Sequence, residues 1–349
     1  ARRARGGTGV ARCRECVRKV RATMGHAMRV LIIGSSNPWR MEAATERALR
    51  RAGHETLIVD DRRTKRAIGW RMTQHMVRAR ARHFRPDFIF LSKCLALDLE
   101  TVRRLLGDTQ NAMWYHDPQW FRDTDRPDIG HILAVARLAH TFFVTGFDAE
   151  WRALGTNAKF LPAAGDSGIR PVAPDPAYAA DAAFIGTGYD PSRAELLLQL
   201  ARNHDVRVFG PGWERWRGEL KWNGRSIEGT EFAQVCSSSA VVLGINPSRA
   251  AGGISYTSDR TWMVMLAGAF YLGHGTAGVT QFLIDGKHCA WYADAGDCAA
   301  KLDHYLRDPA ARERIRREGE QFVRRNHTYD QRIANLLSGE AWTAASVTG

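Results

Sequence analysis

Residues 29–53, RVLIIGSSNPWRMEAATERALRRAG, decide the expected fold because they hold one strand, one turn and one helix in direct succession. The continuous apolar run Arg29–Ile33 is typical of a strand that is buried on both faces. The turn Gly34–Pro38 follows, and Glu42–Ala52 is expected to form a helix that Gly53 ends. A strand followed by a covering helix predicts a parallel sheet.

The same alternation continues along the chain in two blocks. Residues 163–180 interrupt it with glycines and prolines, as an interdomain linker does. We therefore predict an α/β protein with two Rossmann-like, doubly wound parallel-sheet domains facing a cleft, since such sheets bind ligands at the carboxyl ends of their strands. The domains are expected at residues 28–165 and 181–326, with a linker at 166–180. Further strands are expected at residues 56–59, 88–91, 112–115, 141–144, 182–185, 206–209, 240–243 and 270–272.

Length and composition fit this organisation. The 349 residues suit two domains of ordinary size, and the hydrophobic fraction of 44% with a charged fraction of 25% describes a folded globular protein. No stretch approaches the ~18 consecutive apolar residues of a membrane span, and the N-terminus lacks the apolar core of a secretion signal. We expect a cytoplasmic protein.

The net charge of +13 is concentrated at the N-terminus, where residues 1–27 hold eight basic residues and one acidic residue. A basic tail binds phosphate without specificity, so a nucleic-acid-binding protein is one alternative. The other is a solvated tail, or sequence upstream of the true start, with the folded protein beginning at Met28. The first alternative predicts that deleting residues 1–27 abolishes function.

Cysteine spacing gives no metal site. Cys13 and Cys16 form a CxxC pair, but a structural zinc site needs a second pair of ligands. We therefore predict no metal site. Lys93–Cys94 offers a nucleophile without an activating base in the nearby sequence.

The segment Ser255–Phe270, SYTSDRTWMVMLAGAF, is the most informative for function. Ser258 and Asp259 can cap a helix that Arg260 enters, and free N–H groups at a helix start beside a guanidinium suit a diphosphate. Gly275–Val279 is a second glycine-bearing loop that is expected to open a short helix. The alternative is an ordinary connection with a well-capped helix, and local chemistry alone does not separate the two.

In the first block, Trp114–Pro118 ends a strand at the edge where ligands are expected. His116 beside Asp117 can act as a general base on an acceptor hydroxyl, because a histidine pKa lies near neutrality. The loop with Ser35 and Asn37 can contact phosphate or acceptor. The alternatives are a strand-end histidine held by local hydrogen bonds and a plain βα turn.

Several short segments occur in an order and spacing that resemble a known family. They are FIGTGYDPSR at 184–193, VFGPGW at 208–213, LGIN at 243–246, the helix 260–268, FLIDG at 282–286 and HTYDQR at 327–332. Together they span about residues 181–335, and the chain resembles the donor domain of group 1 glycosyltransferases, in particular the family around the spore-maturation protein CgeB. The first block matches that family in layout only.

The resemblance implies a GT-B architecture, an acceptor-side first domain, and a C-terminal helix within 327–349 that returns to it. It implies transfer of a sugar from a nucleotide-diphosphate donor, with that donor as co-substrate, no cofactor, and a glycan, protein or small-molecule acceptor. The donor-binding residues that it implies, together with the phosphate loops above, are Gly186, Gly188, Gly210, Asn246, Tyr256, Ser258, Asp259, Arg260, Gly275, Thr276, Gly278 and Val279.

One departure from the family pattern concerns the ribose. Many retaining relatives carry two glutamates eight residues apart, the second of which grips the ribose, and Ser255 and Met263 stand at the corresponding positions here. Methionine cannot accept hydrogen bonds from ribose hydroxyls, so Asp259, one helical turn earlier, is the candidate replacement. A catalytically inactive nucleotide-sugar-binding protein is therefore a second hypothesis.

Overall fold

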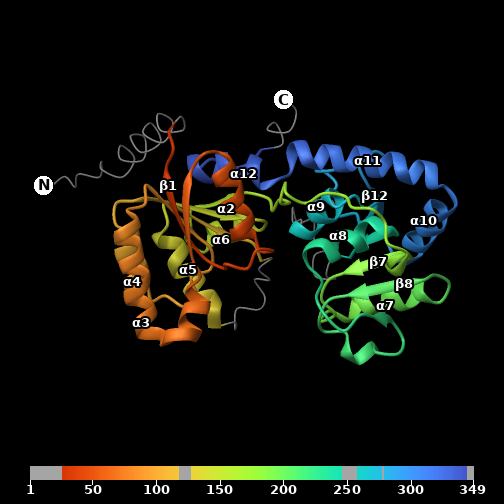
Figure 1. The fold of residues 1–349 in the computed structure, drawn as a ribbon, viewed down its shortest axis with the longest axis horizontal. Helices are drawn as coiled ribbons and strands as arrows, with labels where there is room; N and C mark the ends of the chain where they lie inside the picture. The colour runs from red at the N-terminus through yellow and green to blue at the C-terminus, as the bar shows by residue number, and fades with distance from the viewer. Residues whose placement is uncertain (1–25, 118–126, 246–257, 277–278, 344–349) are drawn as a thin grey trace, which may run out of the picture. The chain divides into compact units, whose positions relative to one another are not determined.

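The computed structural model describes residues 26–117, 127–245, 258–276 and 279–343 (Figure 1). The chain forms two compact units. The first comprises Ala1–Leu161 and Asp330–Thr343, and the second comprises Pro162–Tyr329 and Ala344–Gly349. None of the described helices is long and apolar enough to cross a membrane.

The first unit contains a six-stranded parallel sheet in the order β2-β1-β3-β4-β5-β6. The chain leaves β1 in one direction and β3 in the other, so the switch point of this sheet lies between them. The strands are β1 (Arg29–Ile33), β2 (Glu55–Val59), β3 (Phe88–Leu91), β4 (Gln110–Tyr115), β5 (Thr141–Val144) and β6 (Ala158–Phe160).

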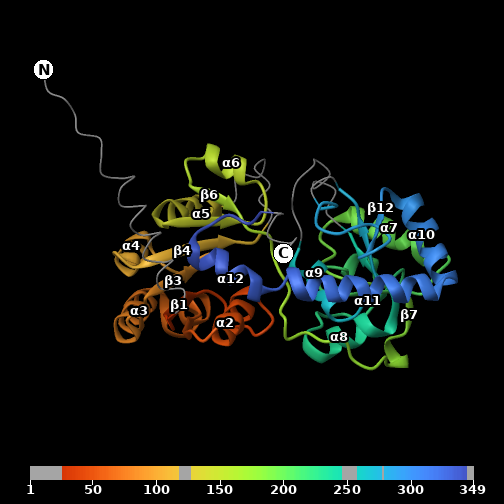
Figure 2. The same ribbon diagram turned by 90° about the horizontal axis from the view of Figure 1, so that it is seen from above.

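Helices cover both faces of this sheet. Alternate strand residues such as Leu31 and Ile33 join a buried cluster with residues of α3 (Asp61–Phe84), α4 (Leu99–Leu106), α5 (Pro127–Leu138) and α6 (Asp148–Ala153). On the other side, α2 (Met41–Arg51) lies next to α12 (Tyr329–Ser338), as Figures 1 and 2 show. The Arg51 guanidinium donates to both Asp330 carboxylate oxygens at 2.7 and 2.9 Å, which fixes α12 on the first unit although it follows the second in sequence.

The second unit contains another six-stranded parallel sheet, in the order β12-β11-β10-β7-β8-β9. Its switch point lies between β7 and β10. The strands are β7 (Ala180–Ile185), β8 (Val206–Phe209), β9 (Lys221–Trp222), β10 (Ser239–Gly244), β11 (Tyr271–His274) and β12 (Ala290–Tyr292). Its helices are α7 (Pro191–Ala201), α8 (Gly229–Ser238), α9 (Asp259–Leu266), α10 (Ala295–Arg307) and α11 (Pro309–Asn326), with short 3-10 turns η1 (Pro176–Tyr178) and η2 (Glu214–Trp216).

The predicted α/β class with two doubly wound parallel sheets is confirmed. Five elements, β6, β9, β12, α6 and α8, were not predicted from the sequence. Most of these are too short to show a period: β9 has two residues and β6 has three. The proline-rich segment expected as a linker is fastened to the second unit, where Ser237 Oγ and Ser238 Oγ accept from the Val172 and Asp175 N–H groups at 3.2 and 2.8 Å.

Candidate functional site

The carboxyl end of the second sheet is built by two glycine turns that touch. Gly186 follows β7 and Gly210 follows β8, and the Gly186 N–H donates to the Phe209 carbonyl at 2.8 Å. A Cβ on Gly210, which has φ +126°, would lie 2.2 Å from the Gly186 carbonyl oxygen. A Cβ on Gly188 would lie 2.4 Å from the Gly212 carbonyl oxygen. The turns therefore bring together three of the predicted donor-binding residues, Gly186, Gly188 and Gly210. Only glycine allows these backbones to approach so closely.

Arg260 reaches this end of the sheet from α9. Its Nη1 donates to the Ile185 carbonyl at 2.8 Å, and its guanidinium carbon lies 5.1 Å from the centre of the Phe184 ring. A Cβ on Gly186 would lie 2.1 Å from that Nη1, so the guanidinium occupies the space that a side chain there would fill. Arg260 forms no ion pair with a carboxylate among the described residues. Its Nη2 and Nε donors remain for a ligand.

A second guanidinium, that of Arg193, contacts the same Phe184 ring and was not singled out from the sequence. Arg193 Nη1 donates to the Thr187 carbonyl and hydroxyl at 2.9 and 3.0 Å, and its guanidinium carbon is 5.8 Å from the centre of the Phe184 ring. The sequence did hold a signal for Arg193, because it stands three residues after Asp190. The Asp190 carboxylate caps α7 by accepting from the Ser192 N–H. Two guanidinium groups next to a glycine turn make this edge strongly electropositive, as a diphosphate site requires.

The start of α9 is capped as expected, by Ser258. The Arg260 N–H donates to Ser258 Oγ at 3.3 Å and to Asp259 Oδ1 at 2.8 Å, so this donor is already used by the protein. Asp259 keeps its second carboxylate oxygen, while Met263 is half-buried on the same helix. The structure thus offers Asp259 Oδ2 as an acceptor for a ribose hydroxyl. Of the other donor candidates, Asn246, Tyr256 and Gly278 lie outside the described residues, as does Ser255.

The second glycine-bearing loop follows β11. The Gly275 N–H donates to the Tyr292 carbonyl at 2.8 Å, and the Val279 N–H donates to the Thr276 carbonyl at 3.0 Å. The described residues around it form turns, and Thr276 and Val279 are both buried; the short helix expected here is not among them. Any contact of this loop with a ligand is therefore expected through its backbone.

The tryptophans of the second unit are structural. Trp213 is fully buried in the core, and its Nε1 donates to the Gly186 carbonyl at 2.9 Å. Trp222 Nε1 donates to the Gly210 carbonyl at 2.7 Å. These two indole N–H groups therefore stabilise the two glycine turns.

In the first unit, Asp117 forms an ion pair with Lys93, which follows β3 as Asp117 follows β4. From the sequence, Lys93–Cys94 offered a nucleophile without an activating base nearby. Cys94 is instead buried, and burial raises the pKa of its thiol well above the usual range, so the thiolate is disfavoured.

His116 is half-buried by surface area and packs against Trp114. Its ring centre is 4.2 Å from that of Trp114, and neither ring nitrogen has a hydrogen-bond partner among the described residues. Burial lowers the pKa of His116 to about 3, and the positive charge of Lys93 adds to the effect. The assumption of a near-neutral pKa was therefore wrong, because it considered the residue type without its burial.

Ser35 and Asn37 close their own turn. Ser35 Oγ accepts from the Asn37 N–H at 3.2 Å, and Asn37 Oδ1 accepts from the Trp39 N–H at 2.9 Å. Both side chains thus have the local role that a βα turn gives them, and a ligand would compete with these bonds.

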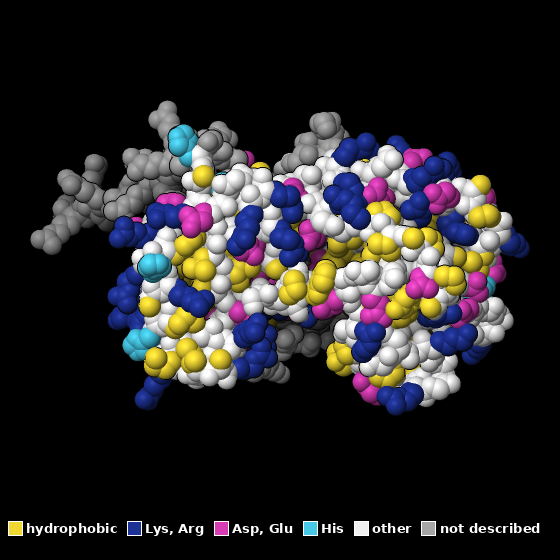
Figure 3. Space-filling view, in the orientation of Figure 1, with side chains coloured by type: hydrophobic (Ala, Val, Ile, Leu, Met, Phe, Trp, Pro, Cys, Tyr) yellow, Lys and Arg dark blue, Asp and Glu magenta, His cyan; other side chains and the backbone are white. Residues whose placement is uncertain are grey.

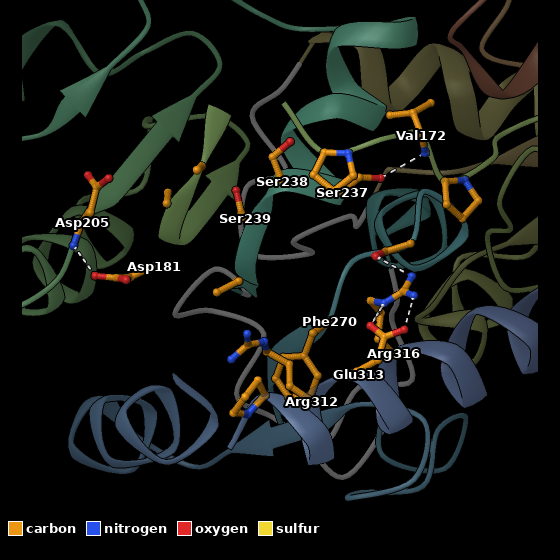
Figure 4. A pocket seen from close by; sticks show the side chains of 17 residues that line it. Val172, Asp181, Asp205, Ser237, Ser238, Ser239, Phe270, Arg312, Glu313 and Arg316 are labelled. Atoms are coloured by element: carbon orange, nitrogen blue, oxygen red, sulfur yellow. Dashed lines mark hydrogen bonds and ion pairs between the residues drawn. The ribbon is translucent and has the colours of Figure 1, made fainter. Parts of the chain in front are cut away.

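A cavity of about 800 Å³ in the second unit lies away from these residues (Figure 4). It borders the amino ends of β7 and β10, at Ala180 and Ser239, whereas Gly186 and Arg260 mark the carboxyl end of the same sheet. Its two arginines are Arg312 and Arg316, and Arg316 is paired with Glu313 at 2.6 Å. The predicted donor residues do not line this cavity.

Comparison with known proteins gives the class of fold. Residues 193–338 match a family model described as glycosyl transferase-like. The structure is similar to Anabaena HepE in complex with UDP-glucose (TM-score 0.64, 12% identity, 90% of this chain and 100% of that chain covered). It is also similar to sucrose-phosphate synthase from Thermosynechococcus elongatus (0.63, 14%, 88% and 98%). An α-glucosyltransferase in complex with UDP and DNA gives a TM-score of 0.63 at 10% identity, with 90% and 100% covered. No curated protein sequence matches the chain.

The chain therefore has the GT-B glycosyltransferase fold. The second unit carries most of the family match, because residues 193–329 of the matched range belong to it. The narrower CgeB-like family remains a prediction.

The close approach of the two glycine turns predicts a steric effect on stability. Gly210→Ala places a methyl group against the Gly186 carbonyl, whereas Gly224→Ala, at a φ of +80°, meets nothing within 4 Å. Both variants bear the cost of a positive φ, so Gly210→Ala should lose roughly 2 kcal/mol more in urea-induced unfolding. Equal losses would show that the turns separate without cost.

Burial of His116 predicts acid sensitivity. The unfolded ring takes up a proton near pH 6.5 and the folded ring only near pH 3, so stability is lost as pH falls between these values. His116→Gln should reduce that loss by on the order of 1 kcal/mol per pH unit. Thermal unfolding measured at several pH values tests this, with His83→Gln, an exposed histidine on α3, as the control. The same slope in wild type and His116→Gln would contradict the burial.

Proposed function

We propose that the protein is a glycosyltransferase that takes a sugar from a nucleotide-diphosphate donor. The observation that carries the proposal is the Arg260 guanidinium at the switch point of the second sheet, where the Gly186 turn leaves room for it. The match of residues 193–338 to a glycosyl transferase-like model supports it, as do similar folds solved with UDP or UDP-glucose.

In the proposed reaction, an acceptor hydroxyl oxygen forms a bond to the anomeric carbon of the sugar while the bond from that carbon to the diphosphate oxygen breaks. The leaving group gains negative charge at that oxygen. Arg260, with Arg193 close by, stabilises this charge, and no metal ion or cofactor is needed at this step. The acceptor is a glycan, a protein or a small molecule, and the proposed location is the cytoplasm.

Asp117 is the better proposed acceptor-activating group of the two named from sequence. With its pKa at about 3, His116 is neutral at pH 7 and is a weak base. The Asp117 side chain is 44% exposed, so a ligand hydroxyl can reach it. Lys93 keeps the carboxylate in place. His116 then acts by holding Trp114 and the strand end rather than by taking the proton.

The alternative hypothesis is a catalytically inactive nucleotide-sugar-binding protein, and it rests on Met263. Both proposals expect donor binding, so binding does not separate them. Incubation with UDP-sugars and detection of released UDP does: release of UDP supports the enzyme, and binding without release over a range of donors and acceptors supports the rival. Asp259→Asn would then test whether its second carboxylate oxygen holds the ribose.

Replacement of Arg260 should selectively weaken the donor. Arg260→Ala removes a charge-assisted hydrogen bond to the diphosphate, worth about 1.5–3 kcal/mol, so Kd for UDP should rise roughly 10- to 100-fold. Isothermal titration calorimetry measures this. Arg202→Ala, an exposed arginine at the end of α7, is the matched control. If Arg260→Ala binds UDP as the control does, the donor site is elsewhere.

A further inference from the structure

The proposed chemistry makes no use of a surface on α3 that is both basic and apolar. We call it the α3 patch: Arg62, Arg63, Lys65, Arg66, Ile68, Trp70, Arg71 and Met72. Its three large apolar side chains belong to the few exposed large hydrophobic side chains of the described residues, at 45% for Ile68, 45% for Trp70 and 56% for Met72. Every residue from Lys65 through Met72 is exposed. Figure 3 shows dark-blue and yellow side chains side by side at the lower left, where Figure 1 places α3.

The local backbone explains this exposure. Gly69 has φ +78° and ψ 167°, so α3 turns a corner there. The corner is fixed from one side by Thr73 Oγ1, which donates to the Gly69 carbonyl at 2.8 Å. Gln74 Nε2 donates to the Trp70 and Ala96 carbonyls at 3.1 and 2.8 Å. Since Thr73 and Gln74 are buried, the corner is part of the folded unit and presents its side chains outward.

The beginning of α3 is equally well fixed. Asp60 caps it by accepting from the Arg63 N–H at 2.8 Å, and the other Asp60 oxygen accepts from the Ser36 N–H at 2.9 Å. The first turns, which carry the cations, are thereby tied to the loop after β1. The patch is a preformed surface.

The five cations of the α3 patch outnumber the carboxylates near them, of which Asp60 interacts electrostatically with Arg66. None of them forms an ion pair with a carboxylate in the part of the chain that the structure describes. The single acidic residue within α3, Asp61, is buried and accepts from the Ala96 N–H at 2.9 Å. Other helices treat their arginines differently: Arg104 pairs with Glu100 on α4, and Arg324 pairs with Glu320 on α11. On α3, five cations without such a pair lie within one short stretch, Arg62–Met72.

We propose that the α3 patch binds the surface of an anionic lipid bilayer. Unpaired lysine and arginine attract anionic headgroups, and an exposed tryptophan with two aliphatic side chains at a corner can enter the boundary between headgroups and acyl chains. Nucleic acid would use the cations and could stack on Trp70, but it leaves Ile68 and Met72 without a favourable contact. This combination favours a bilayer as the partner.

Sedimentation with vesicles tests the proposal on the full chain. Binding to phosphatidylcholine vesicles that contain phosphatidylglycerol is expected, with little binding to phosphatidylcholine alone and a decrease as salt rises. Lys65→Glu should weaken binding about fivefold or more, whereas Arg202→Glu on the second unit should not. Trp70→Ala should weaken binding by about tenfold. Its control is Trp39→Ala, because Trp39 is also in the first unit and is 42% exposed.

Three results would overturn the proposal. The first is absence of binding to anionic vesicles. The second is equal binding by all variants, which would assign any binding to another part of the chain, such as the basic residues 1–27. The third is that Lys65→Glu loses vesicle binding while Trp70→Ala keeps it, and that DNA or RNA shows a gel shift that depends on Lys65. That result would identify a nucleic-acid surface. UDP binding should be unchanged in Trp70→Ala, so the result is independent of the donor site.

Discussion

The hydrogen bond from Arg260 to the Ile185 carbonyl is the contact on which the donor half depends. It joins the helix after β10 to the last residue of β7, the two strands on either side of the switch point. It exists only because Gly186 has no side chain, and the Gly186 turn in turn keeps its shape because Gly210 can approach it. Trp213 and Trp222 then hold both turns through their indole N–H groups. The position of the Arg260 guanidinium thus depends on two glycines and two tryptophans.

Much of the fold could be predicted from the sequence because fully buried parallel strands appear as unbroken apolar runs. Arg29–Ile33, Phe88–Leu91 and Val206–Phe209 were predicted with the bounds that the structure has. The edge strands failed this test: Lys221–Trp222 has a charged residue and two positions only. Helix α8 was missed because Gly229–Ser238 is rich in small and polar residues, and its place is set by packing against β7 and β10 rather than by its own pattern.

The candidate site was predictable to a smaller extent, for a different reason. Glycine turns and a capped helix leave a local signature, so Gly186, Gly210 and Ser258 could be named. Partners that are distant in sequence leave none: Lys93 and Asp117 are 24 residues apart, and Arg193 and Arg260 share only the Phe184 ring as a neighbour. The protonation state of His116 depends on burial, which no single residue or motif encodes.

The distribution of charge is known from the sequence, but the pairing of charges is known only from the structure. The sequence alone placed much of the excess in residues 1–27 and treated the rest as ordinary surface. In the structure, several arginines pair with a carboxylate three or four residues away on the same helix, as Arg316 does with Glu313. On α3 the carboxylate of Asp61 points into the protein, so no such pairing occurs there, and the cations share their corner with exposed apolar side chains. Two helices rich in arginine therefore differ: three arginines of α11 pair with glutamates of the same helix, whereas the cations at the start of α3 remain for a partner.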